Sequence, residues 1–161
     1  MDFAAILAIP LGLVEAFAAM PNGPLIAAIA LWLMTAVFTA LSVPGTIIPM
    51  SFTSGVLLGL SGVFVIATGA VVGSIALFVV TRRSLSEWMR RKLGARLDGI
   101  GEHLERRGPL YVVGARVTGV PNLLVTAGSA ITPITTRTFA AASLLGMLPA
   151  IVIAVVAGSA L

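Results

Sequence analysis

The sequence has no cysteine and only one histidine, His103, among its 161 residues. The absence of cysteine excludes disulfides and thiolate metal sites. A single imidazole among polar neighbours cannot build a metal site of several histidines either. The sequence therefore predicts no metal site and no cofactor.

Charged residues are also scarce. They make up 10% of the chain, whereas hydrophobic residues make up 58% and the mean hydropathy is +1.10. In a soluble domain about a quarter of the residues are charged. Between Ala16 and Thr81 there is no Asp, Glu, Lys or Arg, a run several times longer than the ~20 apolar residues that cross a bilayer. We predict an all-α, polytopic integral membrane protein.

Three apolar stretches, residues 25–43, 63–81 and 139–161, are long enough to cross a membrane. Residues 1–24 are expected to form a helix followed by a boundary rich in proline and glycine, and this helix either spans the membrane or lies at its interface. The N-terminus lacks the basic region of a signal peptide, so we expect the segment to be retained.

Two further segments, residues 44–62 and 109–133, are apolar but interrupted by proline and glycine. Broken backbone at membrane depth is tolerated only where protein or a wet cavity surrounds it, because lipid cannot satisfy free N–H and C=O groups. We predict that each segment is a re-entrant helical hairpin, interrupted at Pro44–Gly45 in the first and at Pro121–Asn122 in the second.

Positive charge is concentrated in residues 82–108, which hold eight of the ten basic residues. The positive-inside rule places this segment in the cytoplasm, where its charge faces lipid headgroups rather than nucleic acid. Its apolar residues recur at helical spacing, and Ser84 with Glu87 fits a capping box. These features predict an amphipathic helix on the inner membrane surface, with a solvated linker helix as the alternative.

This topology can be tested by cysteine labelling, since the native chain has no cysteine to give background. In intact cells, Arg90→Cys and Arg96→Cys should be protected from an impermeant thiol reagent, and both should react once the membrane is permeabilised. Labelling in intact cells would contradict the cytoplasmic placement and with it the predicted directions of the hairpins.

If residues 82–108 are cytoplasmic, the first hairpin opens outward and the second inward. Two hairpins that enter the membrane from opposite faces predict an inverted repeat, formed by residues 25–81 and 109–161. The binding site is then expected near the bilayer midplane, between the two halves. A short internal match supports the repeat. Gly55 and Gly128 each close a T-x-G pattern, and Gly73 and Gly146 follow them at the same interval.

The order of these motifs resembles the DedA superfamily, also called VTT-domain or SNARE-associated Golgi proteins. In the first half the resemblance rests on SVPGTIIPMSFTSGVLLG followed by GAVVG. In the second half it rests on Arg116, then PNLL, then AG, then TFAAASLLGMLPAIVIAVVAG. It covers about residues 20–161. No acidic residue occurs between Pro44 and Gly55, which resembles the Golgi-protein-like branch rather than DedA proper and argues against carboxylate-based proton coupling.

The resemblance implies a lipid transporter, a flippase or scramblase that moves phospholipids or polyprenyl phosphates between leaflets, and it implies no enzymatic activity. The expected partners are membrane lipids with anionic phosphate headgroups, without nucleic acid, and a homo-oligomer stays open. The expected location is the bacterial inner membrane. The alternatives are a small-anion or ion-coupled transporter or channel of the same architecture, and a membrane scaffold that transports nothing.

Arg116 is the first candidate for a phosphate-binding residue. An arginine at the centre of a membrane helix costs about 2.5–3.5 kcal/mol, so it is normally paired or functional. Its planar fork suits a phosphate, and no acidic residue follows Glu105 to pair with it. Asn122 could donate a hydrogen bond to a headgroup, or it could bond the backbone groups left free at the tip of the hairpin. Gly119 and Pro121 interrupt the helical backbone beside it. The alternative is that Arg116 caps backbone carbonyls or extends to the cytoplasmic face.

Other candidates lie at the ends of the predicted crossings. Arg82 ends one crossing and is matched by the resemblance, whereas Arg137 begins the last one and is explained by the positive-inside rule. A further group of residues is expected to shape the hairpins or to allow close helix packing. This group consists of Pro44, Gly45, Gly55, Gly59, Gly69, Gly73, Gly128 and Gly146.

Overall fold

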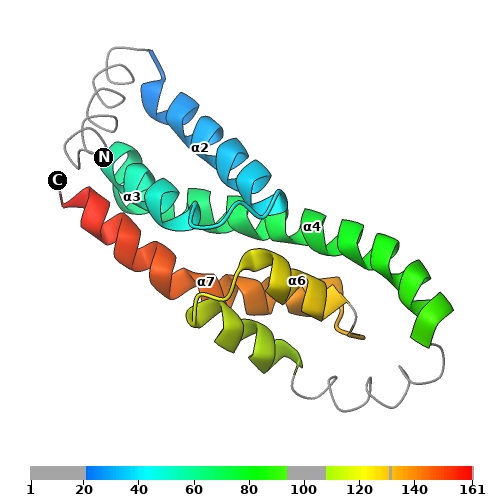
Figure 1. The fold of residues 1–161 in the computed structure, drawn as a ribbon. Helices are drawn as coiled ribbons and strands as arrows, with labels where there is room; N and C mark the ends of the chain where they lie inside the picture. The colour runs from blue at the N-terminus through cyan, green and yellow to red at the C-terminus, as the bar shows by residue number, and fades with distance from the viewer. Residues whose placement is uncertain (1–20, 94–107, 131, 161) are drawn as a thin grey trace, which may run out of the picture.

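The computed structural model describes residues 21–93, 108–130 and 132–160, and no strand occurs among them. The prediction of an all-α chain is confirmed. The expectations for residues 1–20 and 94–107 lie outside the described residues. The elements, shown in Figure 1, are α2 (Gly23–Ala40), α3 (Ile47–Leu58), η1 (Gly59–Ser61), α4 (Gly62–Leu93), α6 (Asn122–Ala130) and α7 (Thr136–Ser159). Residues 108–117 are also helical.

Three helical stretches of the described residues are long and apolar enough to cross a membrane: Gly23–Ala40, Ile47–Ser84 and Thr136–Ser159. Large apolar side chains cover their outer surfaces, with Phe64 75% exposed and Ile153 70% exposed. Exposed apolar surface of this extent is unusual for a soluble monomer and is what contact with acyl chains requires.

Helix α4 continues well beyond the predicted end of its crossing. It has 32 residues, which at 1.5 Å per residue is about 48 Å, against a hydrocarbon core of about 30 Å. The helix passes through Ser84 without interruption, so the capping box predicted there does not start a new helix. Basic residues do not end a helix, because Arg and Lys are good helix formers, and so α4 extends to Leu93.

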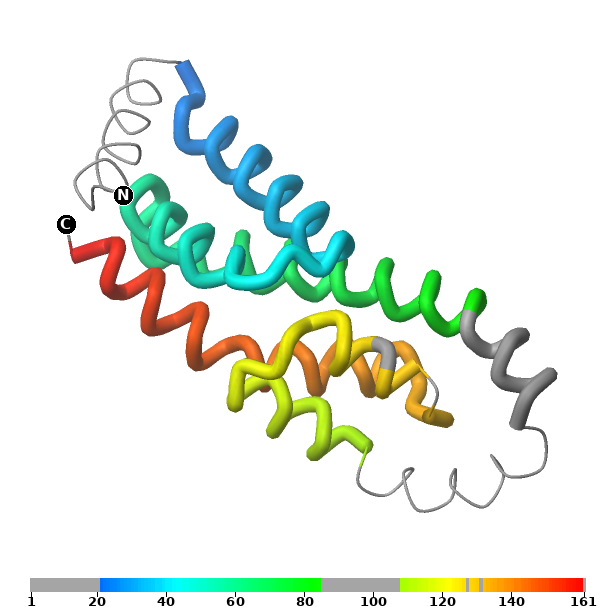
Figure 2. Tube along the Cα trace, viewed as in Figure 1, coloured from blue at the N-terminus to red at the C-terminus, as the bar shows by residue number. Residues whose placement is uncertain are grey.

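The first hairpin is built differently from the prediction. Residues 44–62 contain a single helix, α3, followed by η1, rather than two arms of their own. The chain reverses at residues 41–46, so the arms are α2 and α3, and it reverses again at η1 into α4 (Figure 2). Pro44–Gly45 therefore lies in the turn between the two arms. Gly45 has φ +77°, a backbone conformation that residues with a side chain rarely adopt.

The second segment has two helical arms. Residues 108–117 form one arm and α6 forms the other, joined by residues 118–121. With 9 residues, α6 is about 14 Å long, too short to cross a bilayer. The two arms then lead into the long helix α7.

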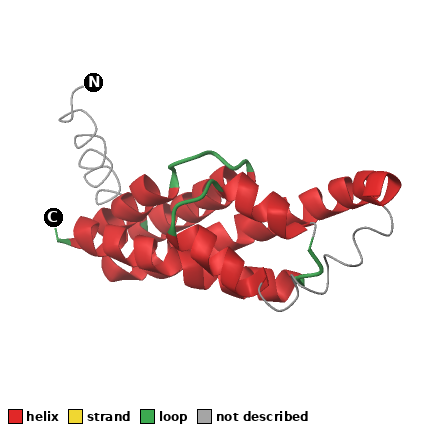
Figure 3. Ribbon diagram, turned by 60° about the horizontal axis from the view of Figure 1, so that its bottom comes forward, coloured by secondary structure: helices red, strands yellow, loops and turns green. Residues whose placement is uncertain are grey.

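Helices α4 and α7 run in opposite directions along the bundle, and each follows one of the two-arm units (Figure 1). Their contact includes Phe78 and Phe139, whose rings stack with centroids 4.4 Å apart. A second cluster contains Ile66 and Ile151. Phe78 lies twelve residues after Ile66 on α4, and Ile151 lies twelve residues after Phe139 on α7. The cluster around the stacked rings and this second cluster are therefore about 18 Å apart along the helices. Figure 3 shows the elongated bundle that results.

The turns at the two arm ends have the same backbone hydrogen bonds. At the end of α2, Val43 N–H donates to the carbonyl of Phe38 at 3.0 Å, and Ser42 N–H donates to that of Thr39 at 3.1 Å. At the end of the 108–117 helix, Val120 donates to Ala115 at 3.0 Å and Gly119 to Arg116 at 3.3 Å. Both pairs are Schellman motifs, which need a left-handed residue at the same place. Ser42 (φ +56°) and Gly119 (φ +77°) supply it.

A glycine on each long helix packs against the arm that precedes the turn. A Cβ on Gly73 would lie inside contact distance of the Ala36 carbonyl and 2.9 Å from the Cβ of Thr39. A Cβ on Gly146 would lie 3.0 Å from the Val113 carbonyl and 2.5 Å from the Cβ of Arg116. Thr39 and Arg116 thus occupy matching positions in the two halves of the chain.

The remaining predicted packing glycines behave differently from one another. Gly55 and Gly69 lie against neighbouring backbone, since a Cβ on Gly69 would be 2.9 Å from the Trp32 carbonyl. A Cβ added to Gly59 or Gly128 would have no atom of a packed neighbouring segment within 4 Å, so neither glycine mediates close packing. Gly59 instead adopts φ +61° in the turn that leads into α4.

Candidate functional site

Arg116 lies in the last turn of the 108–117 helix, half-buried beside α6. Its Nη1 donates to Oδ1 of Asn122, and its Nη2 donates to Oγ1 of Thr126 at 3.4 Å. Thr126 in turn donates its hydroxyl to the same Oδ1 at 3.3 Å. The guanidinium is therefore held by neutral oxygens.

The local sequence explains why these side chains meet. The left-handed conformation of Gly119 reverses the chain directly after Arg116. The carbonyl of Pro121 accepts from Leu124 N–H at 3.0 Å, which starts α6. Asn122 and Thr126 are four residues apart, on one face of α6, and that face is turned toward the arginine.

Asn122 also joins the two halves of the chain. Its Nδ2 donates to the carbonyl of Thr39 at 2.8 Å and to Oγ of Ser42 at 3.3 Å, both at the turn that ends α2. The side-chain oxygen of Asn122 thus accepts from Arg116, and its side-chain nitrogen donates to the turn at the end of α2. We call the five residues Arg116, Asn122, Thr126, Thr39 and Ser42 the turn junction.

Two buried atoms of the turn junction are left without a hydrogen-bond partner in the described residues, Oγ1 of Thr39 and Nε of Arg116. The Nε of Arg116 is buried and makes no hydrogen bond within the described part of the protein. A buried donor without a partner costs about 1–3 kcal/mol, and more when it is charged. The Nε and Nη edge of a guanidinium is one that can bind two oxygens of a phosphate. The arginine is therefore incompletely satisfied by the protein.

Arg82 and Arg137 lie apart from the turn junction. Arg82 Nη1 donates to the carbonyl of Ile134 at 2.6 Å, and its guanidinium carbon is 5.5 Å from the centroid of the Phe78 ring. Ile134 precedes α7, whereas Arg116 contacts α7 at Gly146, roughly three turns further along. Arg137 is exposed. Arg82 therefore fastens the connection into α7, and only Arg116 of the three candidate arginines lies at the junction.

Sequence reasoning missed Thr39, Ser42 and Thr126. Thr126 follows Asn122 at helical spacing and could have been found from that spacing. Thr39 and Ser42 could have been found from a second internal match, because Val43–Pro44 and Val120–Pro121 follow the two arms at the same interval. When these dipeptides are aligned, Thr39 and Arg116 occupy equivalent positions.

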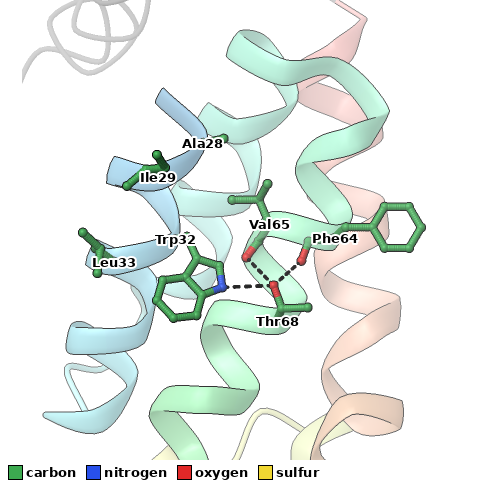
Figure 4. A pocket seen from close by; sticks show the side chains of 7 residues that line it. All are labelled: Ala28, Ile29, Trp32, Leu33, Phe64, Val65 and Thr68. Carbon is green, nitrogen blue, oxygen red and sulfur yellow. Dashed lines mark hydrogen bonds between the residues drawn. The ribbon is translucent and has the colours of Figure 1, made fainter. Parts of the chain in front are cut away.

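A separate surface groove lies between α2 and α4. It has a volume of about 430 Å³ and is lined by apolar side chains together with Trp32 and Thr68 (Figure 4). The indole Nε1 donates to Oγ1 of Thr68 at 3.1 Å, and that hydroxyl donates to the carbonyl of Phe64 at 2.6 Å. Because its polar groups are satisfied by one another, the groove offers hydrocarbon surface and no phosphate site.

Comparison with known proteins identifies the family. The family model of the VTT domain matches residues 43–160, which include α3, α4, α6, the turn beside Arg116 and all of α7. No curated protein and no solved structure matches the chain. The match covers most of the sequence and contains two of the three candidate membrane spans, Ile47–Ser84 and Thr136–Ser159. The chain belongs to the VTT-domain family of membrane proteins, the family of DedA and the SNARE-associated Golgi proteins.

Proposed function

We propose that the protein moves phosphate-bearing lipids between the leaflets of the membrane and binds the phosphate at Arg116. The observation that carries this proposal is the state of the guanidinium, which is held by neutral oxygens and has a buried Nε without a partner in the described residues. A cation at membrane depth without a counter-charge is costly. A phosphate would supply the counter-charge and accept from Nε at the same time.

The repeated geometry supports an inverted repeat with this site at its centre. Both arms end in Schellman motifs followed by Val-Pro, and both long helices approach their arm at a glycine, Gly73 or Gly146. The long helices α4 and α7 are antiparallel (Figure 1), so the two turns point toward each other. In transporters with opposed half-helices the substrate site lies near the midplane, and we propose the same placement for the turn junction.

The surface beside the junction favours a lipid over a small anion. Val117 and Leu124 are each 61% exposed, and Leu123 is 51% exposed. These side chains flank Arg116 and Asn122 in the sequence and present apolar surface to the outside. This apolar surface would hold the acyl chains of a lipid in the bilayer while its phosphate binds the arginine. A membrane scaffold would have no use for an arginine that is incompletely paired.

The proposal is tested with the purified protein in liposomes that carry fluorescent, acyl-labelled lipids. We expect rapid exchange of labelled phosphatidylglycerol between leaflets and slow exchange of a neutral glycolipid with the same chains, measured by quenching of the outer leaflet. Equal exchange of both lipids, or of neither, would contradict the proposal. Flux of inorganic phosphate without lipid exchange would favour the small-anion alternative.

A further inference from the structure

Four buried hydroxyls near the turn junction have no hydrogen-bond partner in the described part of the protein. They are those of Thr35, Thr39, Ser74 and Ser143, each at most 3% exposed. Buried hydroxyls in helices normally donate to the carbonyl three or four residues earlier. Ser51, Ser54 and Ser129 do so here, at 2.6–2.7 Å. The four unpartnered hydroxyls are therefore an exception within this same molecule.

Two of these hydroxyls lie at one level of the bundle. Ser74 comes four residues before Phe78 on α4, and Ser143 comes four residues after Phe139 on α7. Because α4 and α7 are antiparallel and the two rings stack, both serines lie one turn from the stack in the same direction. They form a polar level between the two apolar clusters.

This polar level is also the level of the turn junction. Thr39 lies against Gly73, the residue before Ser74. Arg116 lies against Gly146, which is one turn beyond Ser143 on α7. Thr39, Ser74, Ser143 and Arg116 therefore belong to four helices that meet at about the same level of the bundle. We call Thr39, Ser74 and Ser143 the hydroxyl set.

Among the described residues, Arg116 is the one charged side chain at this level of the bundle. The one acidic residue that the structure describes is Glu87, thirteen residues beyond Ser74 on α4 and so about 20 Å away along the helix, and no other carboxylate of the described part of the chain is available at this level. A phosphodiester with an uncharged headgroup would leave the site neutral. A headgroup that carries an ammonium would find no carboxylate for it, and a doubly charged phosphomonoester would leave a net negative charge. An unpaired charge in a low-dielectric site is costly.

From the single charge and the hydroxyl set we infer the substrate class: a lipid phosphodiester with one negative charge and an uncharged, hydroxyl-bearing headgroup. Arg116 binds the phosphate, and the hydroxyl set binds the headgroup hydroxyls, each of which can both donate and accept. This inference rests on the proposed function and narrows it. It disfavours zwitterionic phospholipids and polyprenyl phosphates.

The wild-type protein in liposomes tests the inference without any substitution. We expect acyl-labelled phosphatidylglycerol to exchange about tenfold faster than phosphatidylcholine or phosphatidic acid with identical chains, since each mispaired charge costs at least one charged hydrogen bond. If all three exchange at similar rates and all depend on Arg116, the inference is overturned and the proposed function stands. If none exchanges, both fail.

A matched pair of variants tests the role of the hydroxyl set. Ser74→Ala with Ser143→Ala should slow phosphatidylglycerol exchange and bring its rate closer to that of phosphatidylcholine. Ser129→Ala removes an equally buried hydroxyl that is bonded to its own helix, and it should leave the ratio of the two rates unchanged. An unchanged ratio in the double variant would contradict the inference.

A binding measurement covers the case in which the double variant does not fold. Dioctanoyl phosphatidylglycerol should raise the thermal unfolding temperature of the wild-type protein in detergent more than dioctanoyl phosphatidylcholine does. Glycerol phosphate and inorganic phosphate distinguish a lipid site from a site for free phosphate. Equal stabilisation by both lipids, or stabilisation by inorganic phosphate alone, would overturn the inferred substrate class.

Discussion

Arg116→Ala is expected to slow lipid exchange by about 10- to 100-fold, because a hydrogen bond to a charged group is worth roughly 1.5–3 kcal/mol. The fold should survive, since Asn122 keeps its bonds to Thr39 and Ser42 and still accepts from Thr126. Arg116→Lys keeps the charge and loses the planar fork, so its rate should lie between those of alanine and wild type. Exchange is measured in liposomes and thermal unfolding in detergent.

Arg137→Ala is the matched control for this prediction. It removes the same charge from an exposed position at the start of α7, away from the turn junction, and should change the exchange rate by less than about twofold. A well-folded Arg116→Ala protein that exchanges lipid at the wild-type rate would show that the arginine is structural. In that case the phosphate must bind elsewhere.

Much of the architecture was predictable because hydropathy and helix breakers act locally. The absence of charge from Ala16 to Thr81 predicted membrane helices, and Gly119 with Pro121 predicted a break beside Arg116. The contact of Arg116 with Asn122 could be anticipated because only a turn separates them. The break and the contact beside Arg116 depend on residues within about two helical turns of one another, and the membrane helices depend on a continuous apolar run.

The boundaries of the first hairpin were harder to predict. Pro44–Gly45 and Gly59 are both strong helix breakers, and the sequence between them is apolar throughout. Hydropathy alone does not tell which break is the turn between the two arms, α2 and α3, and which is the turn that leads into the long helix α4. The contact of Asn122 with Thr39 and Ser42 distinguishes them, and it joins residues about 80 positions apart. No local pattern carries that information.

The T-x-G match shows a different limit of sequence patterns. Gly55 and Gly128 occupy equivalent places in it, yet only Gly55 lies against another helix. The first half of the chain has a 12-residue α3 that reaches α7, whereas α6 has 9 residues and ends earlier. A shared sequence pattern therefore does not tell which of its glycines are packed.

The largest loss of stability is expected at the contact between α3 and α7. A Cβ on Gly55 would overlap the carbonyl of Val155, and a Cβ on Gly158 would overlap that of Phe52. Both neighbours are backbone atoms, which cannot rotate away as a flexible side chain can. We expect Gly55→Ala and Gly158→Ala each to lower the stability by about 1–3 kcal/mol, the usual cost of overpacking. Thermal unfolding in detergent measures the change.

Gly128→Ala is the control that separates packing from helix propensity. It makes the same substitution at the equivalent place of the T-x-G pattern, inside α6, where no atom of another packed segment lies within 4 Å of the added Cβ. Alanine is favoured over glycine in a helix by about 1 kcal/mol, so this variant should unfold at the wild-type temperature or above it. If Gly55→Ala and Gly158→Ala are as stable as this control, the added methyl groups do not overlap the facing backbone, and α3 and α7 lie further apart than in the structure. If all three lose stability alike, these glycines matter through the turns and helix ends near them rather than through the contact.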